Sequence, residues 1–206
     1  MGLLFRLAAA AAASVALALA VPREVRAHCD TMDGPTVADG RRALDTGDVN
    51  HALKWVDEHH EAELAGAFDL ARRVRGLGED ARELADRFFL ETLVRLHRAG
   101  EGEPYTGVKP SGFPIDERAA AADRCIAAGT LDQLEPLVPD ERLPELRERF
   151  SRVLATRDFD VADLAAARAH IAAYVGFVHL AEGEERGHGA PLAGPGHPHG
   201  ALHGHE

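Results

Sequence analysis

The chain has 206 residues, of which 23 are basic, 34 are acidic and 12 are histidine, and its formal net charge is −11. Such an acidic balance argues against nucleic-acid binding, which needs a basic face for phosphates, and favours cations or basic partners. Aromatic residues make up only 5% of the sequence. Together with abundant Ala, Leu, Arg and Glu, this composition is typical of packed helices rather than sheets.

Residues 1–27 have the pattern of an export signal. A short basic leader precedes an apolar run over residues 7–21, which is too short to span a membrane comfortably. Val25 and Ala27 satisfy the small-residue rule for signal cleavage. We therefore expect cleavage after Ala27, a secreted or periplasmic protein, and no membrane span after processing. A cut after Ala20, or an uncleaved anchor, is the alternative.

Cleavage after Ala27 would place a free amine, the imidazole of His28 and the thiol of Cys29 next to one another, followed by Asp30. The amine and ring nitrogen of one histidine can chelate a metal, and a thiolate is a soft ligand, so this set suits Cu, Ni or Zn. The amine must first lose a proton, which its ordinary pKa of roughly 7.7 to 8.0 allows near neutral pH. Alternatively, Cys29 forms a disulfide with Cys125, and the two roles exclude each other.

Glycine and proline divide the first half of the mature chain into helices. Pro35 suits the first turn of a short helix that Gly47 ends. From Val49 the apolar residues follow one stripe of a helical wheel that includes His60, which predicts one long helix up to the break at Gly76. Three further side chains fall on its outer face and are expected to be solvated: His51, Trp55 and His59.

A second long helix is predicted from Glu79 to Ala99. Apolar residues at helical spacing mark its inner face: Phe89, Leu93 and Leu96. Four alternating charges form an outer ladder: Glu83, Arg87, Glu91 and Arg95. Residues 100–114 contain four Gly and three Pro, and we interpret this segment as a crossover between two halves.

The second half resembles the first at an ungapped offset of 82 residues. Identical residues at this offset include Arg42 with Arg124, Gly47 with Gly129, Phe68 with Phe150 and His97 with His179. The register predicts an internal duplication with units of about 36–103 and 118–185. Two such units predict an all-α domain over residues 28–186 that is similar to a four-helix bundle, with additional short helices.

The offset also places His97 and His179 near the ends of equivalent long helices. A pseudo-twofold axis would bring both imidazoles to one point, where they could hold a metal or an anion, with Glu182 on the same face as His179. Alternatively, each histidine binds a neighbouring carbonyl or carboxylate separately. A di-iron centre is not expected, because the Glu-x-x-His order is reversed here and Arg142 stands where His60 would recur.

Residues 187–206 are rich in Gly, Pro and His and have no apolar periodicity, which predicts a disordered tail. Five histidines in this tail would bind Zn, Ni or Cu weakly: His188, His197, His199, His203 and His205.

The start from His28 to Pro35, HCDTMDGP, together with the run from Phe89 to Gly102 and the segment Pro104-Tyr105-Thr106-Gly107, resembles an uncharacterised family of exported bacterial helical proteins. The resemblance spans roughly residues 28–183. The function of that family is unknown, so the resemblance implies export and a helical fold, and no activity.

The His28-Cys29-Asp30 start also resembles, over a narrower stretch, the nickel superoxide dismutases. These are four-helix bundles whose mature chain begins His-Cys and binds nickel through the terminal amine, the His ring and two Cys thiolates. The second Cys and the following Tyr of that hook are absent here, with Met32 and Asp33 in their place. The resemblance therefore implies ligand placement at this end of the chain rather than a redox-active nickel centre.

The chain contains no nucleophile elbow, phosphate loop, dinucleotide fingerprint or zinc-protease motif. The leading hypothesis is an exported helical protein that binds a late transition metal (Cu, Ni or Zn) for buffering, sensing or delivery. The candidate ligands are His28, Cys29, Asp30, His97, His179 and Glu182. Two alternatives stay open: a helical interaction or structural protein of the cell envelope with incidental histidines, and a metalloenzyme acting on reactive oxygen. The sequence identifies no protein partner, substrate or reaction.

Overall fold

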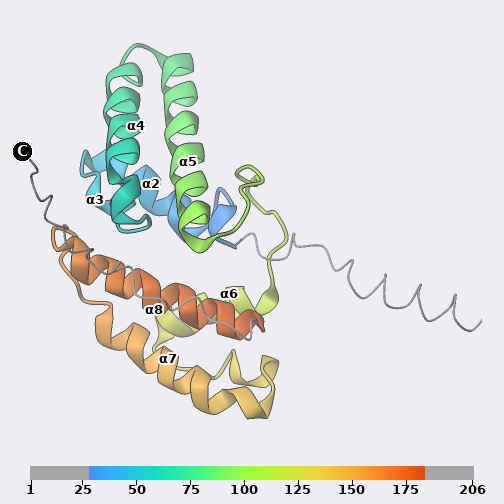
Figure 1. Ribbon diagram of the computed structural model, residues 1–206. Helices are drawn as coiled ribbons and strands as arrows, with labels where there is room; N and C mark the ends of the chain where they lie inside the picture. Colours follow the sequence, from blue (N-terminus) through green and yellow to red (C-terminus); the bar gives the residue numbers. More distant parts are fainter. Residues whose placement is uncertain (1–27, 184–206) are drawn as a thin grey trace, which may run out of the picture.

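A computed structural model describes residues 28–183; the predicted export signal and the His-rich tail lie outside these described residues. In this part of the chain the structure has seven α-helices and four short 3-10 helices, and no strand (Figure 1). The predicted all-α class is therefore confirmed, with helix packing similar to that of a bundle.

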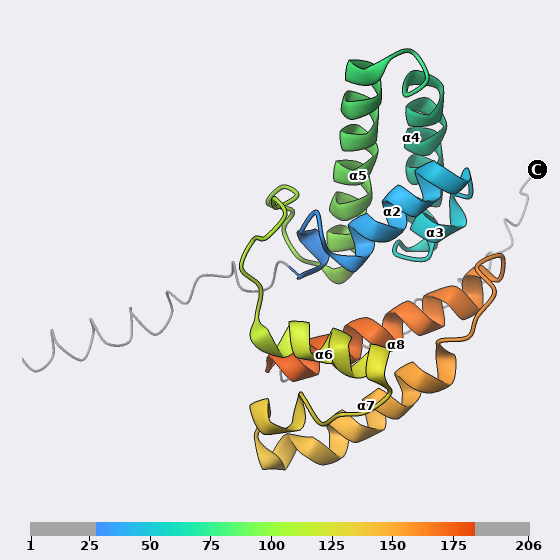
Figure 2. The same cartoon turned by 180° about the vertical axis from the view of Figure 1, so that it is seen from behind.

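The helices form two units that follow each other in the sequence. The first contains α2 (Pro35–Thr46), α3 (Asn50–Leu53), α4 (Glu61–Val74) and α5 (Glu79–Glu101), and the second contains α6 (Glu117–Ala128), α7 (Leu143–Thr156) and α8 (Leu164–Glu182). In the first unit α5 packs against α4 and α2, and in the second α8 packs against α7 and α6. Figures 1 and 2 show α8 passing across the base of the α4 and α5 hairpin, whose other end projects away from the second unit.

Three pairs of corresponding elements in the two units begin and end at the same spacing. Adding 82 to the bounds of α2 and α4 gives those of α6 and α7. The same shift carries the 3-10 helix η3 (Glu58–His60) onto η5 (Asp140–Arg142). A further 3-10 helix, η4 (Glu135–Leu137), precedes η5. The equal lengths follow from equivalent helix stops, since Gly47 and Gly129 both end their helices in the left-handed region, at φ values of 79° and 75°.

One predicted helix is interrupted. The helix expected to run on from Val49 stops at Leu53, where α3 ends, and α4 begins only at Glu61. The predicted outward position of Trp55 is also wrong, because its side chain is only 5% exposed and its Nε1 donates to Asp39 Oδ2 at 2.8 Å.

The second unit stabilises this interruption. Breaking a helix frees backbone carbonyls that need new partners. The buried guanidinium of Arg168 on α8 donates to the carbonyl oxygens of Val56 at 3.1 Å and Leu53 at 3.3 Å. Trp55 then packs edge-on against Tyr174 of α8, with ring centroids 6.0 Å apart. Contacts between distant helices therefore override the local helical pattern.

The hydrophobic core runs through both units. Phe89, Leu93 and Leu96, predicted as the inner face of the long helix, are at most 1% exposed, which confirms that prediction. Among the described residues, α8 is long and apolar enough to cross a membrane by length and composition alone, a test that the core helix of a soluble protein also passes. Here its side chains contribute to the core beside α6 and α7.

The connection between α5 and α6, residues 102–116, crosses over the start of the described chain. The backbone N–H of Lys109 donates to Asp30 O at 2.8 Å, and the N–H of Met32 donates to Lys109 O at 2.9 Å. The backbone of Gly34 also approaches His28 closely. A Cβ on Gly34 would lie 2.2 Å from the His28 carbonyl oxygen. The connection between α5 and α6, together with this close contact at Gly34, holds the 3-10 helix η2 (His28–Asp30) between the two units.

Candidate functional site

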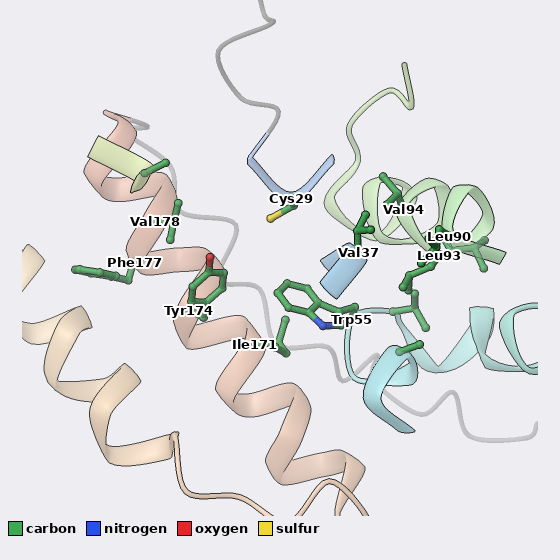
Figure 3. Close-up of a cluster of buried hydrophobic side chains, with 14 of the residues drawn as sticks. Cys29, Val37, Trp55, Leu90, Leu93, Val94, Ile171, Tyr174, Phe177 and Val178 are labelled. Atoms are coloured by element: carbon green, nitrogen blue, oxygen red, sulfur yellow. The ribbon is translucent and has the colours of Figure 1, made fainter. Parts of the chain in front are cut away.

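The three ligands predicted for the first described residues are all buried. His28, Cys29 and Asp30 form η2 and are 5% to 6% exposed. Figure 3 shows Cys29 between Tyr174 and Val178 of α8 on one side and Val37 of the first unit on the other. These first described residues are therefore part of the junction between the units.

The imidazole of His28 is held by the second unit. Its Nε2 lies 2.9 Å from Oδ2 of Asp123 and 3.1 Å from the hydroxyl of Tyr174, which itself donates to Asp123 Oδ1 at 2.8 Å. A carboxylate only accepts, so Nε2 carries a proton, and in the neutral imidazole Nδ1 presents a lone pair. That Nδ1 is shielded from solvent and has no hydrogen-bond partner among the described residues. Metal-binding histidines are commonly oriented by a carboxylate in this way.

Cys29 is a free thiol in the structure, and so is Cys125; both are buried. Burial, reinforced by the nearby Glu101, raises the pKa of the Cys29 thiol far above its ordinary value. The disulfide that was one of two alternatives is thus not formed here. Cys29 is a protonated thiol in this surrounding, and a metal ion would have to displace its proton before the sulfur could serve as a ligand.

Asp30 belongs to a buried ionic network rather than to an open site. The Nε of Arg98 donates to Asp30 Oδ1 at 2.7 Å, and its Nη1 donates to Glu101 Oε2 at 2.9 Å. Burial raises the pKa of Asp30, and Arg98 opposes that increase. The arginine joins η2 to the end of α5 and satisfies one oxygen of each carboxylate.

The two histidines predicted to share a point do approach one group. Nε2 of His97 lies 3.5 Å from Glu101 Oε1, and Nε2 of His179 lies 3.8 Å from the same oxygen. Burial disfavours ionisation of Glu101, but the charges of His97, Arg98 and His179 outweigh it and lower the pKa of this carboxyl. The ends of α5 and α8 therefore meet at a buried carboxylate with an imidazole on each side.

A hydrogen bond to the backbone of Trp55 fixes the orientation of the His97 ring. Its Nδ1 lies 3.0 Å from the backbone oxygen of Trp55, which can only accept, so Nδ1 carries a proton. Its Nε2 then faces Glu101 Oε1, and both atoms are shielded from solvent without a hydrogen-bond partner among residues 28–183. A neutral imidazole would direct a lone pair at a carboxylate oxygen. A proton or a metal cation between the two atoms removes that repulsion.

The remaining predicted ligand, Glu182, lies at the last turn of α8, three residues after His179. Its charge contributes to raising the pKa of Cys29, which places it near the thiol. The structure thus gathers the six predicted residues at one junction. Four further residues belong to it that the sequence did not indicate: Arg98, Glu101, Asp123 and Tyr174. Only Glu101 had a local signal, because it follows His97 by one helical turn.

The donor set at Glu101 is two imidazole nitrogens and a carboxylate oxygen. The thiol of Cys29 is close enough for Glu101 to raise its pKa, and His28 is the residue before it. Imidazole and sulfur favour Zn, Cu or Ni, whereas Ca and Mg prefer oxygen ligands throughout. Three residues fix the supporting contacts: Trp55, Arg98 and Asp123. We call the five residues that carry the donor atoms the inner cluster: His28, Cys29, His97, Glu101 and His179.

The fold and the cluster define a small all-α protein of two helical units with a buried, histidine-lined junction. The chain belongs to a family of unknown function, DUF6448, whose match covers residues 33–180. That match includes the inner-cluster residues of α5 and α8 and begins after His28 and Cys29. No curated protein and no solved structure matches the chain.

Proposed function

We propose that this protein is exported and binds one late transition metal ion in the inner cluster, for buffering, sensing or delivery. The observation that carries the proposal is the convergence of His97 Nε2 and His179 Nε2 on one oxygen of Glu101, at 3.5 Å and 3.8 Å. The fixed orientations of His97 and His28 support it, because metal sites use such supporting hydrogen bonds. We also infer that the two units arose by duplication, which the 82-residue spacing supports.

The test uses the full, signal-processed protein with the five tail histidines replaced by Ser, so that binding by the tail does not contribute. Zn²⁺ and Cu²⁺ are titrated calorimetrically into this protein and into His97→Asn and His179→Asn variants. His170→Asn is the matched control, since His170 also lies on α8 and contacts Thr156, outside the inner cluster.

We expect one high-affinity ion that the control retains. Each inner-cluster substitution should weaken binding by at least about 100-fold, the upper end of what the loss of a supporting hydrogen bond produces. Equal binding by all variants would refute the site. A further form with one Ala ahead of His28 tests the terminal amine, since only a chelate that uses this amine is lost by extending the chain.

A second candidate function, a helical interaction protein of the cell envelope, is favoured by one feature. Large apolar side chains are exposed at the free end of the α4 and α5 hairpin: Leu77 at 79%, Leu84 at 70% and Phe88 at 46%. Exposed apolar groups that lie close together often mark contact surfaces. A Leu84→Glu variant that loses a cross-linked envelope partner but keeps its metal affinity would support this function instead.

A further inference from the structure

A second group of candidate ligands lies outside the inner cluster, at the helix interruption. Asp57, His59 and His60 each offer one ligand atom, and these atoms all lie within 4.8 Å of one another. His59 and His60 lie in η3 and Asp57 is its N-cap, and η3 connects the Trp55 turn to α4. None of them was a predicted ligand, because the sequence placed His59 on the outer face of a continuous helix.

The 3-10 geometry explains why these side chains gather. A 3-10 helix has three residues per turn, so side chains three positions apart lie on the same side. Asp57 and His60 have this spacing, and the N–H of His60 donates to Asp57 O at 2.9 Å. The ring of His59 lies against that of His60, with centroids 3.9 Å apart, and His59 Nδ1 is 4.0 Å from Asp57 Oδ2.

One atom of the group lacks the partner that a buried polar atom normally has. Nδ1 of His60 is shielded from solvent and has no hydrogen-bond partner within residues 28–183. The side chain of Asp57 is 17% exposed and makes no capping hydrogen bond to the start of η3. The carboxylate lies against Gly100, where a Cβ would come within 3.0 Å of Oδ2, so the absence of a side chain leaves room for it.

The position of the group is fixed by the fold. Asp57 directly follows Val56, whose carbonyl oxygen is bound by Arg168, and the buried Trp55 anchors the same turn. Arg168 donates to Glu61 Oε1 at 2.6 Å, so the carboxylate of Glu61 balances the positive charge of this arginine near the three residues. His59, with 69% of its side chain exposed, leaves the group open to ions from solvent.

We propose that Asp57, His59 and His60 form a second, solvent-accessible site for a divalent late transition metal ion, with Zn²⁺ as its simplest occupant. Two imidazoles and one carboxylate are three protein ligands, which leave at least one coordination position open to water or to an exchanging ligand. The site is independent of the inner cluster, with which it shares no residue.

The experiment uses the full, signal-processed protein with its five tail histidines replaced by Ser, titrated with Zn²⁺ and, for spectroscopy, with Co²⁺. His59→Asn and Asp57→Asn are the test variants. His51→Asn is the matched control, a histidine of the same segment that is outside the group. Because His59 is exposed, its substitution should leave the fold intact, which circular dichroism verifies.

We expect His59→Asn and Asp57→Asn each to weaken one Zn²⁺ equivalent by at least about tenfold, or about 1.4 kcal/mol, and to change the visible Co²⁺ spectrum. His51→Asn should change neither. If His59→Asn, Asp57→Asn and the parent bind Zn²⁺ with the same stoichiometry and affinity, the second site does not exist. The outcomes for the two sites can be told apart, because binding at the inner cluster is lost only in the His97→Asn and His179→Asn variants.

Discussion

Nε2 of His28 lies 2.9 Å from Oδ2 of Asp123, which joins the first described residue to the middle of α6. The hydroxyl of Tyr174 on α8 completes this contact by donating to the other carboxylate oxygen at 2.8 Å. Three segments far apart in the sequence are therefore connected through one carboxylate. That carboxylate also determines which nitrogen of His28 carries the proton.

Replacing Asp123 by Ala should destabilise the protein by about 1 to 3 kcal/mol, because His28 and Tyr174 both lose their acceptor while they stay buried. Tyr174→Phe should cost less, about 1 kcal/mol, since His28 keeps the Asp123 carboxylate as its acceptor when the hydroxyl is lost. Urea denaturation of the two variants checks this order. A Tyr174→Phe variant less stable than Asp123→Ala would show that packing of the ring, and not the carboxylate, dominates.

Arg98 should contribute more to stability than any exposed arginine of α5. Arg98→Met leaves the buried Asp30 and Glu101 without their cation, and breaking a buried ion pair typically costs about 3 to 5 kcal/mol. The matched control is Arg95→Met, whose partner Glu63 is about half exposed; such surface pairs contribute about 0 to 1 kcal/mol. Equal denaturation midpoints for the two variants would contradict a structural role for the network.

Two glycine-to-alanine substitutions should change the stability of the protein in opposite directions. Gly34→Ala places a Cβ 2.2 Å from the His28 carbonyl oxygen, so backbone must move, and overpacking of this kind costs about 1 to 3 kcal/mol. Gly66 lies within α4, where an added Cβ would meet nothing within 4 Å, so Gly66→Ala should stabilise by about 0.5 to 1 kcal/mol. Thermal unfolding measures both changes. A stabilised Gly34→Ala protein would show that η2 is not held where the structure places it.

The reactivity of the cysteines distinguishes free thiols from a disulfide between Cys29 and Cys125. Cys29 and Cys125 are free and buried, and burial raises the pKa of Cys29. Both should therefore react slowly with a thiol reagent in the native protein and completely after unfolding in denaturant without reductant. Colorimetric titration counts the thiols. An unfolded, unreduced protein with no reactive thiol would instead demonstrate the disulfide.

Local patterns predicted the helices well where a single residue decides the boundary. Gly47 was predicted to end a short helix, and it ends α2 in the left-handed region. The pattern failed from Lys54 to His60, because the periodic apolar residues there are equally compatible with a helix and with a turn. What decided between them was the guanidinium of Arg168, which is distant in sequence and supplies the donors that the broken helix needs.

The candidate site could be predicted only in part for the same reason. The spacing of the two units identified His97 and His179 as equivalent positions, and both approach Glu101. Whether they bind a metal stays a prediction. Asp123 could not have been found from local sequence, since its role depends on how α6 faces η2. Asp57 was missed because the predicted helix ran through this segment, so no break at η3 was expected there.

The contact between His28 and Tyr174 spans 146 positions. Contacts between residues so distant in sequence require closure of a long loop, which makes them slow to form. Because the chain is synthesised from its N-terminus, η2 must wait for α8, the last described helix, before it is enclosed. The junction therefore forms only when the whole helical domain is present. A chain truncated before α8 retains His28 and Cys29 but lacks the helix that encloses them.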